Sequence, residues 1–219
     1  MSSISSLFSQ ADRDRIKAAV EEAEGKTSGE IVPYVVERSD HYEDAEWRCA
    51  FLLGFIAFCV CVYLRNFTNA WVPVDAVEIG LASFAAFAIG MLAAKYIRPV
   101  KIFFAGRHQI DHRVAQRAAE AFISEEVFDT KRRTGILIFV SLLEHRVLVI
   151  GDTGINAKVN KVEWHSVVER IVAGINEKRI IDGLVDGIRE AGTLLKKRQV
   201  RRRADDRDEI PDSLRVSDR

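Results

Sequence analysis

Acidic side chains follow two segments that the sequence predicts to be strands. Asp40, Glu43 and Asp44 lie in the acidic segment 39–46, and Asp152 comes two residues after a β-branched run. Ligands of α/β proteins gather beyond the carboxyl ends of parallel strands, and carboxylate oxygens suit Ca²⁺ or Mg²⁺. We therefore expect Asp40, Asp44 and Asp152 to hold a divalent cation, with Ca²⁺ as the ion. The alternative is an acidic loop that simply faces water.

Other residue types that perform chemistry are present without their usual companions. His108 and His112 are four residues apart on a predicted helix, but HQIDH lacks the glutamate of the HExxH zinc motif. Ser141 lies in an apolar run without a G-x-S-x-G elbow. The cations of 131–133 could attract phosphate or lipid headgroups, or simply complement a helix end. No catalytic residue can be assigned from these patterns.

The elements that position these residues follow from the hydrophobic pattern. Residues 30–37 and 146–150 are β-branched and predict strands, and 135–142 (GILIFVSL) is a near-continuous apolar run, typical of a strand covered on both faces. Pro33 cannot donate to a strand ladder, which favours an edge or a bulge. Glu30 begins the first strand, opposite the acidic loop, and we expect a structural role for it.

Most of the remaining sequence shows the periodicity of amphipathic helices. Ser9, with Asp12 three residues later, predicts a capping box at the start of the first helix. Residues 108–128 are amphipathic, and Trp164 leads a second apolar stripe, so we expect its indole to be buried. The order of elements predicts an α/β fold, a three-layer α/β/α sandwich with a small mixed sheet.

Two long apolar runs interrupt this domain. Residues 49–64 contain no charge, and residues 76–97 carry Glu78 and Lys95 only near their ends. Roughly twenty apolar residues span a bilayer, and soluble helices of this length show a polar stripe. We therefore predict a two-helix transmembrane hairpin. The alternative is a pair of buried core helices.

Positive charge close to the spans predicts their orientation. Seven cations flank the hairpin on its soluble side: Arg38, Arg48, Arg98, Lys101, Arg107, Arg113 and Arg117. The connector 65–75 carries Arg65 alone. The positive-inside rule then places the soluble domain and both termini in the cytoplasm, with two spans in the cytoplasmic membrane.

The chain therefore divides into four parts. Residues 1–45 and 99–197 form the two pieces of the α/β domain, 46–98 form the hairpin, and 198–219 are predicted to be a disordered charged tail. The formal net charge is zero, and no basic motif interleaved with aromatic residues favours nucleic acid as a partner. All three cysteines lie within 49–61, so the soluble part carries no disulfide framework.

Several short motifs together resemble the TPM domain. They are 27–31 (TSGEI), 133–138 (RTGILI), 151–155 (GDTGI) and Trp164. This family includes the thylakoid-lumen acid phosphatase, photosystem II repair proteins and bacterial membrane proteins, and the chain is similar to its bacterial, membrane-anchored form over roughly residues 8–45 and 105–197. The resemblance implies an α/β/α sandwich and, for some members, calcium binding and weak phosphatase activity.

Two functions are compatible with the sequence. The first is a membrane-anchored module without catalysis, in contact with lipid, that binds a membrane-protein partner and assists the assembly or turnover of a complex. The second is a divalent-metal-dependent phosphatase that uses Asp40 or Asp152 with the acidic loop. The phosphatase needs the two carboxylates within about 5 Å of one another, close enough to couple.

Overall fold

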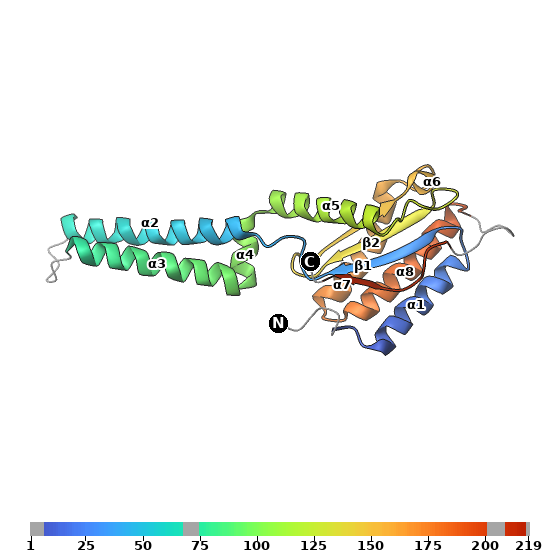
Figure 1. The fold of residues 1–219 in the computed structure, drawn as a ribbon, viewed down its shortest axis with the longest axis horizontal. Coiled ribbons are helices and arrows are strands. Elements are labelled where there is room, and N and C mark those ends of the chain that lie inside the picture. Colours follow the sequence, from blue (N-terminus) through green and yellow to red (C-terminus); the bar gives the residue numbers. More distant parts are fainter. Residues whose placement is uncertain (1–6, 68–74, 201–208, 218–219) are drawn as a thin grey trace. The chain divides into compact units, whose positions relative to one another are not determined.

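A computed structural model describes residues 7–67, 75–200 and 209–217 (Figure 1). The chain forms two compact units, one made of Met1–Asp40 with His112–Arg219 and the other of His41–Asp111. The first unit is a mixed α/β fold around a four-stranded sheet of order β3-β2-β1-β4. Its strands are β1 (Glu30–Val36), β2 (Gly135–Ser141), β3 (Arg146–Gly151) and β4 (Arg215–Ser217). The predicted α/β class with a small mixed sheet is confirmed.

Strand direction varies across this sheet. β1 runs parallel to β2 on one side and to β4 on the other, whereas β2 and β3 are antiparallel. The connection from β2 to β3 is a short hairpin. The connection from β1 to β2 is much longer, and it contains the whole second unit.

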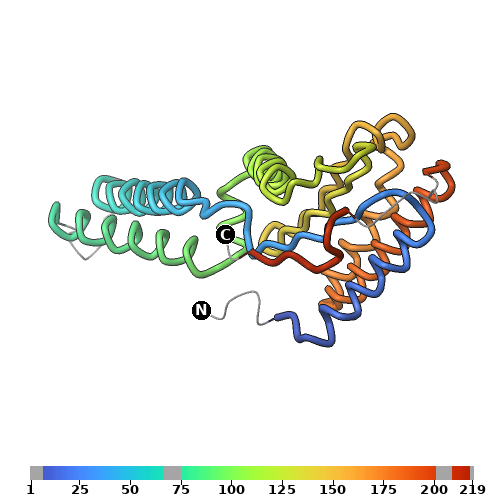
Figure 2. Tube along the Cα trace, turned by 45° about the vertical axis from the view of Figure 1, so that its right-hand side comes forward, coloured from blue at the N-terminus to red at the C-terminus, as the bar shows by residue number. Residues whose placement is uncertain are grey.

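Helices lie against both faces of the sheet (Figures 1 and 2). One face is covered by α1 (Gln10–Glu24), α7 (His165–Asn176) and α8 (Ile180–Lys197). From His112 onward, α5 (Arg107–Ser124) lies along the other face. Two short helices, α6 (Thr153–Asn156) and η2 (Lys161–Trp164), connect β3 to α7.

The alternation of side chains along the central strands divides the core into two layers. Ile31 and Val35 of β1, and Ile138 of β2, pack in the cluster that includes α1, α7 and α8. Successive residues of a strand point to opposite faces, so Tyr34 and Phe139 lie on the α5 side, where their rings stack with centroids 5.9 Å apart. Both strands are buried on both faces, as the near-continuous apolar run of β2 predicted.

Two local predictions are confirmed. Ser9 caps α1 by accepting a hydrogen bond from the Asp12 backbone N–H, and the Asp12 carboxylate accepts one from the backbone N–H of Ser9. Trp164 is buried, with 4% of its surface exposed, in the same cluster as Val167 and Ile171 of α7. The stripe led by Trp164 is therefore the face of α7 that meets the core.

Pro33 lies in β1, a strand that pairs with β2 along its whole length and with β4 only near its end. β4 pairs with β1 only from Tyr34 to Val36, so none of the described strands lies beside Pro33 on that side. A proline is tolerated where its nitrogen needs no acceptor in a neighbouring strand. β1 is thus an edge over its first residues and a central strand over its last.

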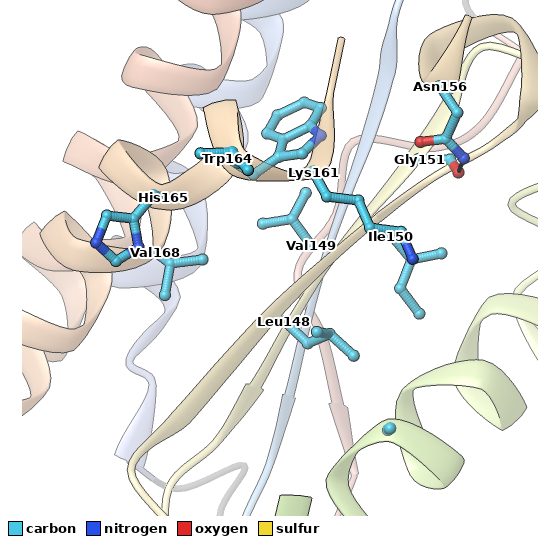
Figure 3. Close-up of a pocket in the computed structure, with 11 residues that line it drawn as sticks. Leu148, Val149, Ile150, Gly151, Asn156, Lys161, Trp164, His165 and Val168 are labelled. Carbon is cyan, nitrogen blue, oxygen red and sulfur yellow. Dashed lines mark hydrogen bonds between the residues drawn. The ribbon is translucent and has the colours of Figure 1, made fainter.

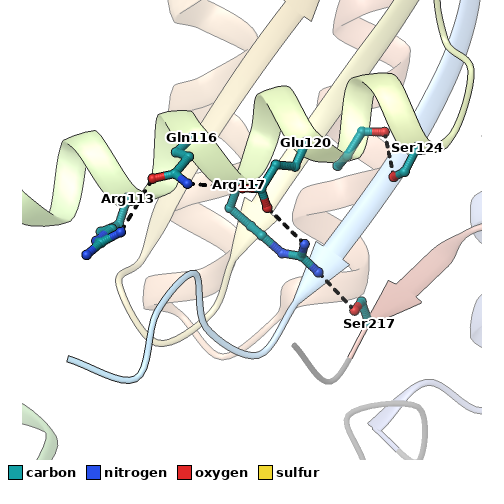
Figure 4. A network of polar contacts seen from close by, with 7 residues as sticks. Arg113, Gln116, Arg117, Glu120, Ser124 and Ser217 are labelled. Carbon is teal, nitrogen blue, oxygen red and sulfur yellow. Dashed lines mark hydrogen bonds and ion pairs between the residues drawn. The ribbon is translucent and has the colours of Figure 1, made fainter. Parts of the chain in front are cut away.

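The predicted disordered tail does not hold for the described residues of 198–219. β4 lies within it, and Ile210 and Leu214 are buried beside it. Arg117 of α5 donates a hydrogen bond to Ser217 at 3.4 Å and pairs with Glu120 at 3.2 Å (Figure 4). The high average charge of the segment concealed a short apolar stretch that can complete a sheet. Residues 201–208 and 218–219 lie outside the described residues.

The second unit is helical. It contains α2 (Glu43–Phe67), α3 (Ala76–Tyr96) and α4 (Arg98–Ala105). α2 and α3 are long and apolar enough to cross a membrane, and only 17% and 11% of their most apolar stretches are buried. Core helices of a soluble protein are mostly buried, so these values argue against that alternative. Residues 68–74 of the predicted connector lie outside the described residues.

Small residues let α2 and α3 approach closely. A Cβ added at Gly90 would lie 2.9 Å from the carbonyl oxygen of Cys49 and 3.0 Å from the Cα of Ala50. Packing through small residues is typical of helices in membranes. A separate contact joins α4 to the start of α2. Lys101 of α4 pairs with Glu46 at 2.8 Å and donates to the carbonyl oxygen of His41 at 3.2 Å. This largely buried ion pair connects α4 to the segment before and within the first turn of α2.

Candidate functional site

The carboxylates expected to share a cation are not assembled into one site. Asp40 follows the carboxyl end of β1 and pairs with Arg113 at 2.8 Å. Asp152 follows β3, and its backbone N–H donates to the carbonyl oxygen of Gly135, at the start of β2. Since β1 and β2 are parallel, Asp40 and Asp152 lie beyond opposite ends of the sheet. Strands of seven residues separate those ends by about 20 Å.

The predicted Ca²⁺ site is therefore wrong for Asp40 and Asp152 as joint ligands of one ion. Asp44 is in the first turn of α2, in the other unit. Within residues 7–67, 75–200 and 209–217, no three histidine, cysteine or acidic side chains form a group that could hold a metal ion. The prediction failed because the rule for carboxyl ends applies to parallel strands, and β3 is antiparallel to its neighbour.

Asp152 instead joins the start of β2 to the end of β3. Its carboxylate pairs with Arg133 at 2.9 Å and accepts a hydrogen bond from the Thr153 N–H at 2.6 Å. The Gly154 N–H donates to the Arg133 carbonyl oxygen, and a Cβ at Gly154 would lie 2.3 Å from the Arg132 carbonyl oxygen. The motifs 133–138 and 151–155 thus meet in a close backbone contact that only glycine permits, and they have a packing role here.

Ser141 is also held in a structural contact. Its hydroxyl donates to the buried Glu144 and accepts a hydrogen bond from the Ser39 hydroxyl at 2.9 Å. The Ser39 backbone N–H donates to Glu144 Oε1 at 2.9 Å. This network ties the loop after β1 to the β2–β3 hairpin.

The remaining sequence candidates are engaged or exposed. Lys131 pairs with Glu209 at 3.5 Å, and the Arg133 guanidinium lies 5.7 Å from the centre of the Phe128 ring. His108 and His112 are both exposed on α5, and neither belongs to a metal-ligand group among the described residues. These contacts assign no chemistry to the histidine pair or to the cations of 131–133.

A groove with a mostly apolar lining runs beside β3 in the α/β unit. It has a volume of about 730 Å³ and is bordered by β3, η2, the start of α7 and one residue of α5, Ala115 (Figure 3). Leu148, Val149 and Ile150 supply its strand side and are each only partly buried. Trp164 and Val168 supply the helix side. Cavities of this size hold ligands in many proteins.

The electrostatics of the groove are one-sided. Lys161 and His165 line it, and no acidic residue does. The Nε2 atom of His165 lies 3.0 Å from Oε1 of Glu169, one helical turn further along α7. Glu169 itself does not line the groove. Val162 stands at the border with 83% of its surface exposed. An apolar recess with a single permanent positive charge suits an apolar ligand that carries a carboxylate.

The sequence contained a signal for this groove that periodicity did not reveal. Residues 146–151 (RVLVIG) are apolar at four consecutive positions, yet β3 is the outermost strand of the sheet. An edge strand facing water is usually blunted by charge or proline. An apolar edge therefore marks a binding surface once the order of strands is known, and a single sequence does not show that order.

Two buried acids, Glu30 and Asp212, form a second unusual cluster with the partly buried Glu24, on the β1–β4 side of the sheet. The pKa of Glu24 is raised to about 10, mainly by burial and also by the nearby charges of Glu30 and Asp212, against the lowering effect of the hydrogen bond from the Ile31 N–H. Glu24 therefore keeps its proton at pH 7. It accepts from the Ile31 N–H at 2.6 Å and is hydrogen-bonded to Asp212, so its role is to join α1, β1 and the segment before β4.

Comparison with solved structures gives a relative in fold. The BA42 protein from the psychrophilic bacterium Bizionia argentinensis, solved by NMR, aligns with a TM-score of 0.59 over 99% of this chain and 100% of that chain, at 22% sequence identity. At this identity the similarity shows the fold alone. No protein-family model and no curated protein matches the chain.

Proposed function

We propose that the chain is a membrane-anchored binding module. Its helical unit holds the α/β unit at a bilayer, and the α/β unit binds a membrane-protein partner whose assembly or turnover it assists. The observation that carries this proposal is the exposure of the hairpin. Phe55 and Phe84 leave 65% and 71% of their surfaces uncovered on helices long enough to span. Lipid covers such side chains without the cost that water imposes.

The position of charge supports the same function. Within α3, Glu78 lies in the first turn and Lys95 in the last. Ionisable residues inside a span usually mark an ion or substrate pathway, and here they stand at the ends of the helix. The hairpin thus has the character of an anchor. Trp47, Phe51 and Phe87 form an aromatic cluster near one end of α2, as in the aromatic belts at membrane surfaces.

The finer features of the sequence analysis belong to this proposal. They are a TPM-like three-layer sandwich, a hairpin inserted between its first strand and α5, and a cytoplasmic location for the α/β unit and both termini. The seven flanking cations support the orientation. The motifs 27–31, 133–138 and 151–155 support the resemblance. The phosphatase alternative gains no support, because its two candidate carboxylates lie beyond opposite ends of the sheet.

The test uses the full chain expressed in bacterial cells. Membranes washed with alkaline carbonate should retain the protein, and photo-cross-linking from exposed positions of the α/β unit should capture a specific membrane protein, identified by mass spectrometry. The control is the chain with Phe55 and Phe84 both replaced by arginine, which should be lost from the membrane fraction. Release of the wild type by carbonate would rule out the anchor. Retention without any cross-linked membrane protein would rule out the partner.

A further inference from the structure

The outer edge of β3 is open to an added strand. β3 is the last strand of the sheet, and no other strand of the described chain pairs with its outer side. The Asp152 N–H donates to the Gly135 carbonyl oxygen, so Asp152 and Gly135 form a hydrogen-bonded pair of the β2–β3 ladder. Antiparallel ladders alternate. The N–H and C=O groups of Val147, Val149 and Gly151 therefore point away from β2, toward the outer edge.

One of these outward groups already has a side-chain partner. The Asn156 side-chain amide donates to the Gly151 carbonyl oxygen at 2.5 Å. An amide group thus occupies the position that the backbone of a neighbouring strand would take at Gly151. No side chain in the described part of the chain is hydrogen-bonded to the backbone groups of Val147 and Val149, and Val149 lines the groove. An added strand can pair along Val147–Val149 and must end where Asn156 begins.

We propose that this edge binds an extended peptide segment of a partner protein by strand addition. The segment carries apolar side chains at alternate positions and a carboxylate close to Lys161. Its backbone hydrogen-bonds to Val147 and Val149. Its side chains on one face contact Trp164 and Val168, and those on the other contact Leu148 and Ile150. In this mode of recognition main-chain hydrogen bonds supply affinity and pockets for alternate side chains supply specificity.

Charge complementarity selects this occupant. Lys161 is the one permanently charged residue that lines the groove, and every other lining residue is apolar or uncharged apart from the titratable His165. A second copy of the chain would present the same positive charge through its own Lys161, which disfavours pairing of β3 with β3. A peptide that carries a carboxylate instead places an anion against that cation.

This inference rests on the proposed function, because it names the kind of segment through which the partner is bound. The probe is a fluorescein-labelled hexapeptide that alternates valine and threonine and ends in aspartate. Its binding to the detergent-solubilised full chain is followed by fluorescence anisotropy. Two further peptides carry N-methyl groups on alternate amides, one on the odd and one on the even positions.

Strand addition predicts an alternating result. Only one set of peptide amides faces β3, so one N-methylated peptide should lose about tenfold in affinity while the other binds as the parent does. Equal loss for both peptides, or no binding of the parent, would overturn the proposal. Concentration-dependent dimerisation of the chain that the peptide reverses would also overturn it, because the edge would then serve a second copy.

A charge exchange tests the role of Lys161. Lys161→Glu should lower the affinity for the peptide that ends in aspartate by about tenfold. The same variant should bind a peptide that ends in lysine more tightly than the wild type does. The control is Lys197→Glu, at an exposed position in the last turn of α8, which should leave both affinities unchanged. Equal effects of the two variants would contradict a carboxylate beside Lys161.

The two proposals fail separately. If Lys161→Glu still cross-links to the same membrane protein in cells and the peptides do not bind, the groove assignment is wrong and the binding module stands. If the peptides bind with the alternating pattern but no membrane protein is captured, the groove is a strand-binding site and the membrane-protein partner is wrong.

Discussion

Helices α8 and α3 place their apolar residues in opposite ways. α8 buries Leu184, Ile188 and Leu195 in the core of the α/β unit, and its other side carries Arg189, which pairs with Glu22 of α1. α3 is apolar on all sides, and Val77 and Leu81 are among its exposed residues. A helix with one apolar stripe needs a core and water, whereas a helix that is apolar all round needs an apolar surrounding. The chain therefore contains one unit whose helices bury an apolar face in a core, and one unit whose two long helices leave large apolar side chains uncovered.

The largest expected effect comes from removing the buried side chain of Trp164, and removal of the exposed Phe84 side chain of α3 is the comparison. Trp164→Ala should lower the free energy of unfolding by about 3–5 kcal/mol, because it empties a buried site between α7 and the sheet. Phe84→Ala should have little effect on unfolding in detergent, since Phe84 touches little protein. Chemical denaturation of the solubilised chain, followed by the signals of the α/β unit, measures both. A larger effect for Phe84 would mean that the hairpin is packed like a soluble core.

The second prediction concerns the place where α2 and α3 pack most closely. Gly90→Ala should destabilise the hairpin by about 1–3 kcal/mol, because the added Cβ meets the backbone of Cys49 and Ala50. Gly80→Ala on the same helix meets nothing within 4 Å and should be neutral or stabilising by up to about 1 kcal/mol. Denaturation in mixed micelles compares the two variants. Equal results would show that the helices do not rely on this contact.

The last prediction concerns a change of stability with pH at Glu24, a carboxyl of the α/β unit with a strongly raised pKa. The pKa of Glu24 is about 10 in the folded chain against an ordinary 4.5, so the folded state holds a proton that the unfolded state releases between these values. The free energy of unfolding should therefore fall as pH rises through this window, by at most about 1.4 kcal/mol per pH unit. Glu24→Gln should flatten that dependence between pH 6 and pH 9.

Glu22→Gln is the matched control on the same helix. Hydrogen bonds from Lys26 and Arg189 lower the pKa of Glu22, so it is ionised in both states between pH 6 and pH 9. Its removal should leave the slope of stability against pH unchanged. Thermal unfolding at several pH values measures all three proteins. A wild-type curve as flat as that of Glu24→Gln would show that Glu24 is ionised when folded.

The sequence predicted those features that depend on neighbouring residues. The capping box at Ser9, the buried face of α7 led by Trp164, and the run of β2 are each set within a few turns or a single strand. The two long apolar runs belong to the same class, since length and the absence of charge are local properties. An insertion between β1 and α5 followed from their position in the chain.

Tertiary structure decided what depends on segments far apart. The parallel pairing of β1 with β2, followed by the β2–β3 hairpin, placed Asp152 far from Asp40, and Asp152 is the N-cap residue of α6. The pairing of β4 with β1 makes part of the segment 198–219 a strand, although the high charge of that segment predicted disorder. The position of β3 at the edge made an apolar strand into one side of a groove. The pairing of β1 with β2 and with β4 joins segments about a hundred residues or more apart. The alternation of side chains along one strand is the same whichever strands lie beside it, so it does not show this order.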